Sequence, residues 1–263
     1  MEQEELIKRI TEEVQKKLRE ETPAESNEPL EKVVESINEE PIKNIASYID
    51  HTLLKADATK EEIDKLCDEA IEYKFCSVCV NTGWASYCAK RLRGTGIKVA
   101  VVVGFPLGAM SSRSKGFEAR HAVEDGANEI DMVINVGALK SKDFKLVEED
   151  IRNVVRATRP NIITKVIIET SLITEEEKVI ACQLSKKADA DFVKTSTGFS
   201  TGGANVEDVA LMKKIVGQKM EVKASGGVKS LEDAVKMIKA GATRLGTSSG
   251  VAIVEGLQGE ADY

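Results

Sequence analysis

From Ile45 onward, short apolar runs alternate with longer amphipathic stretches. The apolar runs are rich in Val and Ile and are bounded by small or polar residues, which is typical of strands buried on both faces. We expect strands at 48–52, 77–81, 98–104, 129–136, 164–169, 192–195, 221–224 and 244–247. The amphipathic stretches predict helices at 59–73, 114–124, 143–159, 174–188, 206–215 and 231–240.

Strand and helix signals therefore alternate along the chain. Two helices begin with a capping-box pattern, Thr59 with Glu62 and Thr174 with Glu177. Eight strands alternating with helices predict an α/β fold of the (β/α)8 TIM-barrel type. A doubly wound sheet is the alternative, but it normally has fewer strands, and the chain lacks the glycine-rich dinucleotide and nucleotide phosphate-binding motifs. We expect the barrel to occupy residues 43–263.

Residues 1–42 have a different pattern. An apolar stripe at helical spacing runs from Leu6 to Leu18, and Pro23, Pro29 and Pro41 follow among acidic residues. This pattern predicts an amphipathic helix on a flexible linker. An isolated helix of this length is only marginally stable in water, so we expect it to fold against a partner, which is either its own barrel or subunit interface, or another protein.

Composition narrows the functional classes. A formal charge of −7 and a pI near 5.2 argue against a nucleic-acid or anionic-membrane surface. The five cysteines are an odd number, and no signal segment or long apolar run is present, so we expect a cytoplasmic protein. Cys76 and Cys79 lie three apart on a predicted strand and cannot chelate one metal, and only two histidines are present. We expect no metal and no cofactor.

Polar residues fall late in the predicted strands, where a barrel carries its active site. They include two lysines, Lys194 and Lys223, within runs that otherwise read as buried strands. A buried ammonium is costly unless it has a partner, a ligand or a lowered pKa, so the two lysines indicate amine chemistry. The remaining polar positions are Asp50, Thr52, Asn81, Asp131, Asn135, Glu169 and Thr170.

Several motifs together resemble one family. They are Ile-Asp-His-Thr at 49–52, Val-Cys-Val-Asn at 78–81, Val-Val-Gly-Phe-Pro-Leu-Gly at 102–108, Glu-Ile-Asp-Met-Val-Ile-Asn-Val-Gly at 129–137, Lys-Val-Ile-Ile-Glu-Thr at 165–170, Val-Lys-Thr-Ser-Thr-Gly-Phe at 193–199 and Val-Lys-Ala-Ser-Gly-Gly at 222–227. In this order they resemble 2-deoxyribose-5-phosphate aldolase. The resemblance implies a metal-independent class I aldolase that reversibly joins acetaldehyde to glyceraldehyde 3-phosphate.

The resemblance also implies roles for individual residues. Lys194 corresponds to the Schiff-base lysine, Lys223 to the lysine that lowers its pKa and moves protons, and Asp131 to the proton donor and acceptor. This agrees with the chemistry, since a lysine attacks a carbonyl only as a free amine. An alternative for Asp131 is a structural salt bridge to a buried lysine. Lys165 corresponds to a charged neighbour, which we expect to act electrostatically.

The same resemblance implies the substrate contacts. We expect the phosphate to lie against glycine-rich loops, and the sugar or aldehyde against residues near the strand ends. The expected phosphate residues are Gly198, Gly226, Gly227, Val228, Gly246, Ser248 and Ser249. The other expected contacts are Asp50, Thr52, Cys79, Asn81, Lys165 and Thr195.

The chain departs from the family at a few positions. Some members carry a cationic residue at the position of Phe199 and an arginine at that of Lys229, so an aldolase with a non-phosphorylated or different acceptor is the competing interpretation. Some members also place a carboxyl-terminal tyrosine in the site, but the tail before Tyr263 does not otherwise match, so we expect a disordered terminus.

Assembly is the remaining expectation. We expect a homo-oligomer. Residues 1–20 resemble the helices that tether enzymes to bacterial microcompartment shells, so cargo targeting stands beside packing on the chain's own barrel. A non-catalytic scaffold is a third interpretation, which the presence of Asp131, Lys194 and Lys223 argues against.

Overall fold

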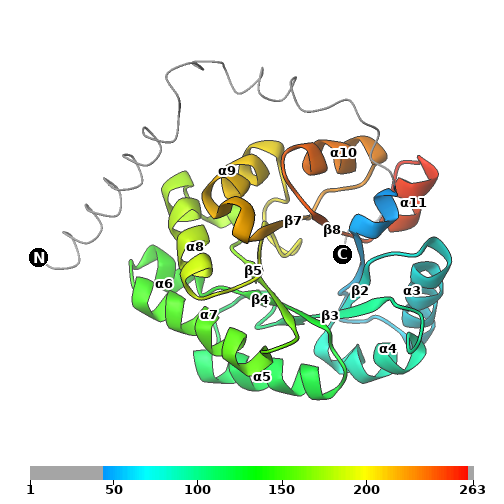
Figure 1. Cartoon of the computed structure of the whole chain (residues 1–263), viewed down its shortest axis with the longest axis horizontal. Helices are drawn as coiled ribbons and strands as arrows, with labels where there is room; N and C mark the ends of the chain where they lie inside the picture. Colours follow the sequence, from blue (N-terminus) through cyan, green and yellow to red (C-terminus); the bar gives the residue numbers. More distant parts are fainter. Residues whose placement is uncertain (1–43, 260–263) are drawn as a thin grey trace, which may run out of the picture. The chain divides into compact units, whose positions relative to one another are not determined.

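The computed structural model describes residues 44–259, and within them the chain forms a closed barrel of parallel strands. Each strand pairs with the next along the chain, and β1 also pairs with β8 (Figure 1). The strands are β1 (Ile49–Leu53), β2 (Ser77–Val80), β3 (Lys98–Val103), β4 (Glu129–Val133), β5 (Ile163–Ile167), β6 (Phe192–Lys194), β7 (Glu221–Ser225) and β8 (Arg244–Thr247). The predicted (β/α)8 barrel is therefore confirmed.

Helices surround the strands, as Figure 1 shows. The α-helices are α3 (Lys60–Tyr73), α4 (Ala85–Arg91), α5 (Ser112–Glu124), α6 (Val136–Lys140), α7 (Phe144–Thr158), α8 (Glu175–Lys187), α9 (Val206–Val216), α10 (Leu231–Lys239) and α11 (Gly250–Glu255). Short 3-10 turns are η1 (Ile45–Tyr48), η2 (Thr82–Trp84), η3 (Thr170–Leu172) and η4 (Gly217–Lys219). The short helices α4, α6 and α11 were missing from the sequence prediction because none is long enough to show a clear helical period.

Local signals explain where the elements begin and end. Both predicted capping boxes are present, with Thr59 accepting from the backbone N–H of Glu62 and Thr174 from that of Glu177. The strand predicted at 129–136 was too long, because the Asn135 side chain accepts a hydrogen bond from the backbone of Ala138 and starts α6. Likewise Tyr48, predicted in the first strand, belongs to η1.

The apolar core lies between the strands and the helices. It includes the outward-facing residues of the strands, such as Val101, Ile130 and Val222, all fully buried. The interior of the barrel has a different character. Among residues 44–259, one small apolar cluster of Leu54, Cys79, Ala100 and Val102 lies apart from the main core, and the other inward positions carry mainly polar and charged side chains. Because alternate strand residues face opposite sides, one strand supplies both the core and the interior.

One buried pair of opposite charges lies outside the barrel interior, between two helices. Lys115 of α5 forms an ion pair with Asp150 of α7 and donates a 2.8 Å hydrogen bond to the carbonyl of Val133. Burial is the main cause that lowers the pKa of Lys115 and raises that of Asp150. This pair fastens two helices to the end of β4.

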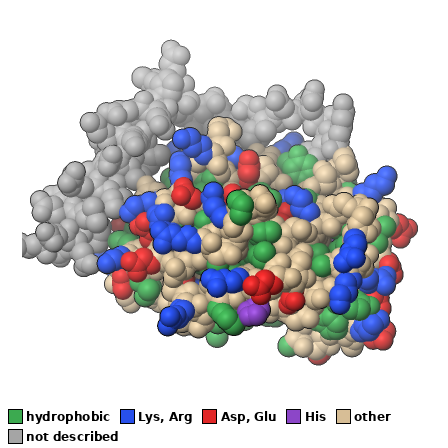
Figure 2. All heavy atoms as spheres, turned by 60° about the horizontal axis from the view of Figure 1, so that its bottom comes forward, with side chains coloured by type: hydrophobic (Ala, Val, Ile, Leu, Met, Phe, Trp, Pro, Cys, Tyr) green, Lys and Arg blue, Asp and Glu red, His purple; other side chains and the backbone are tan. Residues whose placement is uncertain are grey.

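Cationic and anionic side chains are interspersed on the face of the molecule that Figure 2 shows. The cysteines are mostly buried, as small structural thiols are. All five cysteines are free, and four are buried, with Cys76 half-buried. Within residues 44–259, no helix is long and apolar enough to cross a membrane. The predicted amphipathic helix and linker of residues 1–42, and Tyr263, lie outside the described residues.

Candidate active site

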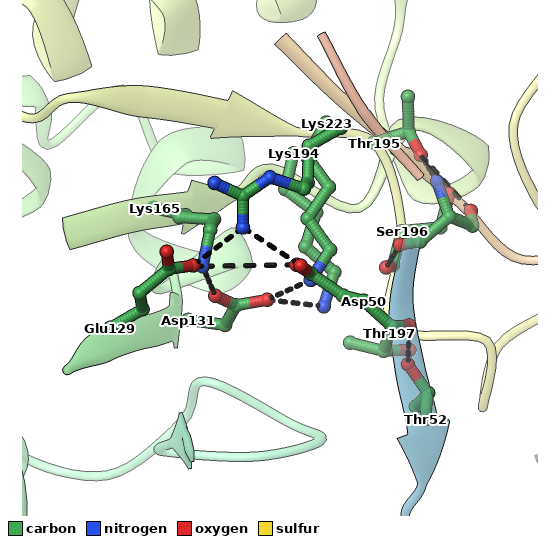
Figure 3. A network of polar contacts seen from close by, with 12 residues as sticks. Asp50, Thr52, Glu129, Asp131, Lys165, Lys194, Thr195, Ser196, Thr197 and Lys223 are labelled. Carbon is green, nitrogen blue, oxygen red and sulfur yellow. Dashed lines mark hydrogen bonds and ion pairs between the residues drawn. The ribbon is translucent and has the colours of Figure 1, made fainter. Parts of the chain in front are cut away.

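Seven charged side chains meet inside the barrel, joined by a continuous set of ion pairs (Figure 3). We call them the barrel charge cluster: Asp50, Glu129, Asp131, Lys165, Lys194, Lys223 and Arg244. None is more than 7% exposed. The predicted trio of Lys194, Lys223 and Asp131 therefore lies together in this cluster, and Asp131 contacts both lysines.

Asp131 is the common acceptor of three lysines. Its Oδ1 accepts from Lys165 Nζ at 2.7 Å. Its Oδ2 accepts from Lys194 Nζ at 2.9 Å and from Lys223 Nζ at 2.8 Å. The two amines predicted to work together thus share one carboxylate oxygen, and an atom that reacts with Lys194 lies next to both Asp131 and Lys223.

The other carboxylates complete the network. Asp50 accepts from Lys223 Nζ, from Arg244 Nη1 at 2.8 Å and from Ser77 Oγ at 2.7 Å. Glu129 contacts Lys165 Nζ at 2.6 Å and Arg244 Nη1 at 2.8 Å. Lys165 and Arg244 therefore each touch at least two carboxylates, whereas Lys194 touches only Asp131 within the described residues.

Strand register explains why residues far apart in sequence meet here. Asp131 of β4 lies opposite Lys165 of β5, Lys194 of β6 lies opposite Lys223 of β7, and Lys223 lies opposite Arg244 of β8. Paired residues on neighbouring strands face the same side of a sheet. Glu129 shares that side because it precedes Asp131 by two residues.

The cluster separates the proton affinities of its lysines. Burial, with the ammonium of Lys223, lowers the pKa of Lys194, and Asp131 offsets this only in part. Burial also opposes the charge of Lys223, but Asp131 and Asp50 outweigh it and raise its pKa well above the usual range. The pKa of Asp131 stays well below its usual range because Lys165, Lys194 and Lys223 outweigh its burial. Lys194 is thus the lysine best suited to be a free amine.

Several other predicted site residues form hydrogen bonds to the backbone around the cluster. Thr52 Oγ1 donates to the backbone carbonyl of Asp50, and Asn81 Nδ2 to that of Leu54. Thr195 Oγ1 donates to the carbonyl of Ser225 and accepts from its N–H, which joins β6 to β7. Cys79 is fully buried, and burial raises the pKa of its thiol. These side chains line or brace the site in this structure.

Glycine-rich loops from β6 and β7 come together above the cluster. Gly198, Gly226 and Gly227 have φ values of 84°, 83° and 79°, in the left-handed region that favours glycine. A Cβ on Gly226 would lie 3.0 Å from the Cα of Gly203 and 3.6 Å from that of Gly198. This packing places three backbone segments side by side, as a backbone cradle for an anion requires.

The remaining predicted phosphate residues follow β7 and β8. Val228 is buried, and its carbonyl accepts from Thr247 Oγ1 at 2.7 Å. Ser249 has a buried hydroxyl without a partner among the described residues, while Ser248 follows β8 directly. Gly246 lies lower, within β8, where a Cβ would lie 2.9 Å from Lys223 Cε. The glycine at 246 therefore makes room for Lys223 and does not form part of the loop.

A buried carboxyl at the end of β5 supports the β6 loop. Glu169 Oε2 accepts from Thr197 Oγ1 at 2.5 Å, and Thr197 Oγ1 in turn accepts from the N–H of Phe199. The ring of Phe199 packs edge-on against Phe105, with the ring centroids 5.2 Å apart. Phe199 is 45% exposed and so presents an apolar surface beside this loop.

The site residues predicted from sequence do not include Glu129, Arg244 or Ser77. The alternation of strand residues was a usable signal, because Glu129 and Ser77 lie two residues before Asp131 and Cys79. Arg244 opens its strand, and nothing in the sequence distinguishes it from a solvent-exposed terminal arginine. Among residues 44–259, no group of three or more His, Cys, Asp or Glu side chains could hold a metal ion.

Comparison with known proteins places the chain among aldolases. Residues 44–256 match the DeoC/LacD family of aldolases. Deoxyribose-phosphate aldolase 1 of Oceanobacillus iheyensis is 60% identical over 84% of this chain and all of its own length. A Geobacillus deoxyribose-phosphate aldolase is 61% identical over 84% of this chain and 99% of its length. The tetrameric enzyme from Aeropyrum pernix is 32% identical with a TM-score of 0.79, over 87% of this chain and 97% of that one.

Proposed function

The chain belongs to the DeoC/LacD family of aldolases, and from that membership we propose that it reversibly cleaves 2-deoxy-D-ribose 5-phosphate into acetaldehyde and D-glyceraldehyde 3-phosphate. The observation that carries the mechanism is a single oxygen of Asp131 that holds both Lys194 Nζ and Lys223 Nζ. A carbon–carbon lyase of this kind needs one amine that is free and one group beside it that can deliver protons.

Lys194 is the nucleophile. Its free amine adds to the C1 aldehyde of the open-chain sugar and gives a carbinolamine, which loses water to form an imine. The 3-hydroxyl then loses its proton, the C2–C3 bond breaks, and glyceraldehyde 3-phosphate leaves while the bonding electrons remain on C2 as an enamine. Protonation at C2 and hydrolysis of the new imine release acetaldehyde and regenerate the amine.

Asp131 and Lys223 move the protons in these steps. Asp131 is a carboxylate next to Lys194, so it accepts protons, directly or through a water molecule. Lys223 is protonated, so it can donate a proton to the hydroxyl that leaves the carbinolamine as water, and its charge stabilises both Asp131 and the developing negative charge on the carbinolamine oxygen. Lys165 and Asp50 hold these two groups in place by their ion pairs.

The phosphate group of the substrate lies on the backbone of the loops at Gly198 and at Gly226–Val228, and at Ser248 and Ser249. Backbone N–H groups in left-handed turns can point together at an anion without a side chain in the way. Thr52, Cys79, Asn81 and Thr195 lie around the sugar chain. This cradle depends on the packing of Gly203 against Gly226.

Product analysis tests the proposal. The protein should release acetaldehyde and glyceraldehyde 3-phosphate from 2-deoxyribose 5-phosphate, with full activity after dialysis against EDTA. Lys194→Ala should lose turnover, while Lys236→Met, a change at a half-exposed lysine paired with Glu232 on α10, should retain it. Failure to release either product from this substrate would overturn the proposal.

An acceptor without phosphate is the second candidate, and Phe199 is the observation that favours it. The exposed ring of Phe199 offers an apolar surface beside the glycine-rich loop that follows β6, where a phosphate would favour a cation. Comparing kcat/KM for 2-deoxyribose 5-phosphate and for 2-deoxyribose distinguishes the two candidates. A preference of less than tenfold for the phosphorylated sugar would favour the second.

Assembly and targeting stay predictions. We propose a homo-oligomer in the cytoplasm, and the tetrameric Aeropyrum pernix enzyme supports the oligomer. For residues 1–42, docking to a microcompartment shell and packing on the chain's own barrel are both open. Fusing these residues to a fluorescent protein in a compartment-forming host tests the first, and diffuse fluorescence would contradict it.

A further inference from the structure

Arg244 and Glu129 are fixed parts of the barrel charge cluster that the reaction does not use directly. They lie nearer the amino ends of the strands than Lys194, and within the described residues neither forms an ion pair with it. The guanidinium of Arg244 lies 5.5 Å from the centre of the Phe192 ring, and Lys165 Nζ lies 6.0 Å from it. The buried ring of Phe192 lies against this side of the cluster, and where water is excluded the interactions between charges are stronger than in solvent.

The charges of the cluster do not balance when all its lysines are protonated. The cluster contains four basic side chains and three carboxylates, and none of these seven residues is more than 7% exposed. A buried group with one excess positive charge is unfavourable, and the loss of one proton makes it neutral. The cluster therefore favours one free amine.

The contacts decide which side chain gives up that proton. Arginine stays protonated in proteins, so Arg244 is excluded. Lys165 has Asp131 at 2.7 Å, Glu129 at 2.6 Å and Asp50 at 3.9 Å, and Lys223 has both Asp131 and Asp50. Lys194 has Asp131 alone and shares its oxygen with Lys223. Lys194 is thus the least stabilised ammonium.

We propose that Arg244 and Glu129 are positioning residues that set the charge balance of the buried cluster and so determine that Lys194 is a free amine near neutral pH. Arg244 supplies the excess positive charge that makes one lysine give up its proton. Glu129 supplies the carboxylate that keeps Lys165 charged, so the proton is lost from Lys194. This inference rests on the proposed function, in which Lys194 is the Schiff-base lysine.

Other ionisable groups lie near the cluster, and burial favours the neutral form of some of them while water screens another. Glu169 at the mouth bonds to Thr197, and burial raises its pKa. Lys98 lies 3.6 Å from Glu129, but its side chain is 45% exposed and screened by water. The thiols of Cys76 and Cys79 are kept neutral because burial raises their pKa. The charged and titratable groups around Lys194, by element, are Asp50 on β1, Cys76 and Cys79 at β2, Lys98 on β3, Glu129 and Asp131 on β4, Lys165 on β5, Glu169 after it, Lys223 on β7 and Arg244 on β8.

The test compares the unmodified protein with Arg244→Met, Glu129→Gln, the double variant, and Arg244→Lys as the charge-preserving control. Two quantities are measured against pH: kcat/KM for 2-deoxyribose 5-phosphate, and the rate at which acetaldehyde and cyanoborohydride alkylate Lys194, followed by peptide mass spectrometry. Alkylation reports the free amine and does not require cleavage of the sugar.

Opposite shifts are expected from the two single variants. Arg244→Met removes a positive charge, so the acid limb of both profiles, the range in which the rate falls as the pH is lowered, moves to higher pH. The rate on that limb should fall about tenfold, as a change of about 1.4 kcal/mol in the charge interaction would produce. Glu129→Gln removes a negative charge, so the limb moves to lower pH. The double variant and Arg244→Lys keep the balance and should stay close to the unmodified protein.

A purely structural role predicts something else, namely lower stability and lower rates at every pH. The inference would be overturned if the acid limb of the pH profiles stays in place in both single variants, or if it moves in the same direction in both. If Arg244→Met does not fold, the shift of Glu129→Gln to lower pH and its reversal in the double variant carry the same test. If the unmodified protein is not alkylated at Lys194 at any pH, the proposed function fails and the inference fails with it.

Discussion

Replacing Lys223 with methionine removes the ammonium nearest to Lys194 and leaves an apolar side chain of similar length. Both Nζ atoms bond to Asp131 Oδ2, at 2.8 and 2.9 Å. They therefore lie within about 6 Å of each other, and at an effective dielectric constant near 20 their repulsion is on the order of 3 kcal/mol. Without this repulsion Lys194 holds its proton more tightly, and its free-amine fraction on the acid limb falls about a hundredfold.

A coupled assay for glyceraldehyde 3-phosphate across a range of pH measures this effect. The sign follows from the direction of the shift: burial and Lys223 lower the pKa of Lys194 in the unmodified protein, so activity is lost only as the pH falls through that lowered value. In Lys223→Met the pKa of Lys194 rises, and the acid limb moves to higher pH. The matched control is Lys236→Met, which should leave the profile in place.

The shape of the profile decides the outcome. A higher pH should restore part of the activity of Lys223→Met, and what remains lost measures the role of Lys223 in proton transfer. A rate that falls by the same factor at every pH, with the acid limb in place, would refute the electrostatic argument. Lys223 would then act only as a proton donor or as a structural residue.

Three further predictions concern the cradle, the proton acceptor and the framework. Gly203→Ala would place a Cβ 2.3 Å from the carbonyl oxygen of Gly226 and so disturb the cradle. The KM for 2-deoxyribose 5-phosphate should rise severalfold, while alkylation of Lys194 by acetaldehyde stays unchanged. An unaltered KM would contradict the role of the cradle in phosphate binding. Asp131→Asn should slow the exchange of the acetaldehyde methyl protons with D2O by about a hundredfold or more, because the carboxylate accepts the methyl proton. The exchange is followed by NMR. Exchange at the rate of the unmodified protein would assign the role of proton acceptor to another group. Lys115→Met leaves the carboxylate of Asp150 buried without its cation, so the free energy of unfolding, measured by urea denaturation, should fall by about 3 to 5 kcal/mol. The double variant Lys115→Met with Asp150→Leu should recover most of this loss. Equal losses in the single and double variants would contradict this account.

The order of strands and helices could be predicted from sequence because each strand lies in a short, mainly apolar run and several helices carry their own caps. Short helices such as α6 escaped prediction because five residues show no period. Lys194, Lys223 and Asp131 were identifiable because charge within an apolar strand is conspicuous. The contacts among them were not, because they depend on the register between strands that are close only in the closed barrel.

Two particular residues show this limit. Gly246 reads in sequence as part of a glycine-rich loop, but its position opposite Ser225 places it inside the barrel, where it makes room for Lys223. Arg244 reads as an ordinary strand-opening residue, but closure of the barrel brings it onto Asp50 and Glu129. Both roles arise from contacts across 20 or more residues of sequence, which no local pattern records.

The central claim is that Lys194, among the three lysines of the barrel charge cluster, is the one that forms the imine. It is tested most directly by incubating the protein with 2-deoxyribose 5-phosphate and borohydride and then mapping the modified lysine by peptide mass spectrometry. The account predicts a reduced adduct on Lys194, none on Lys165 or Lys223, and none at all in Lys194→Ala. An adduct on another lysine, or continued release of glyceraldehyde 3-phosphate with no lysine trapped, would contradict it.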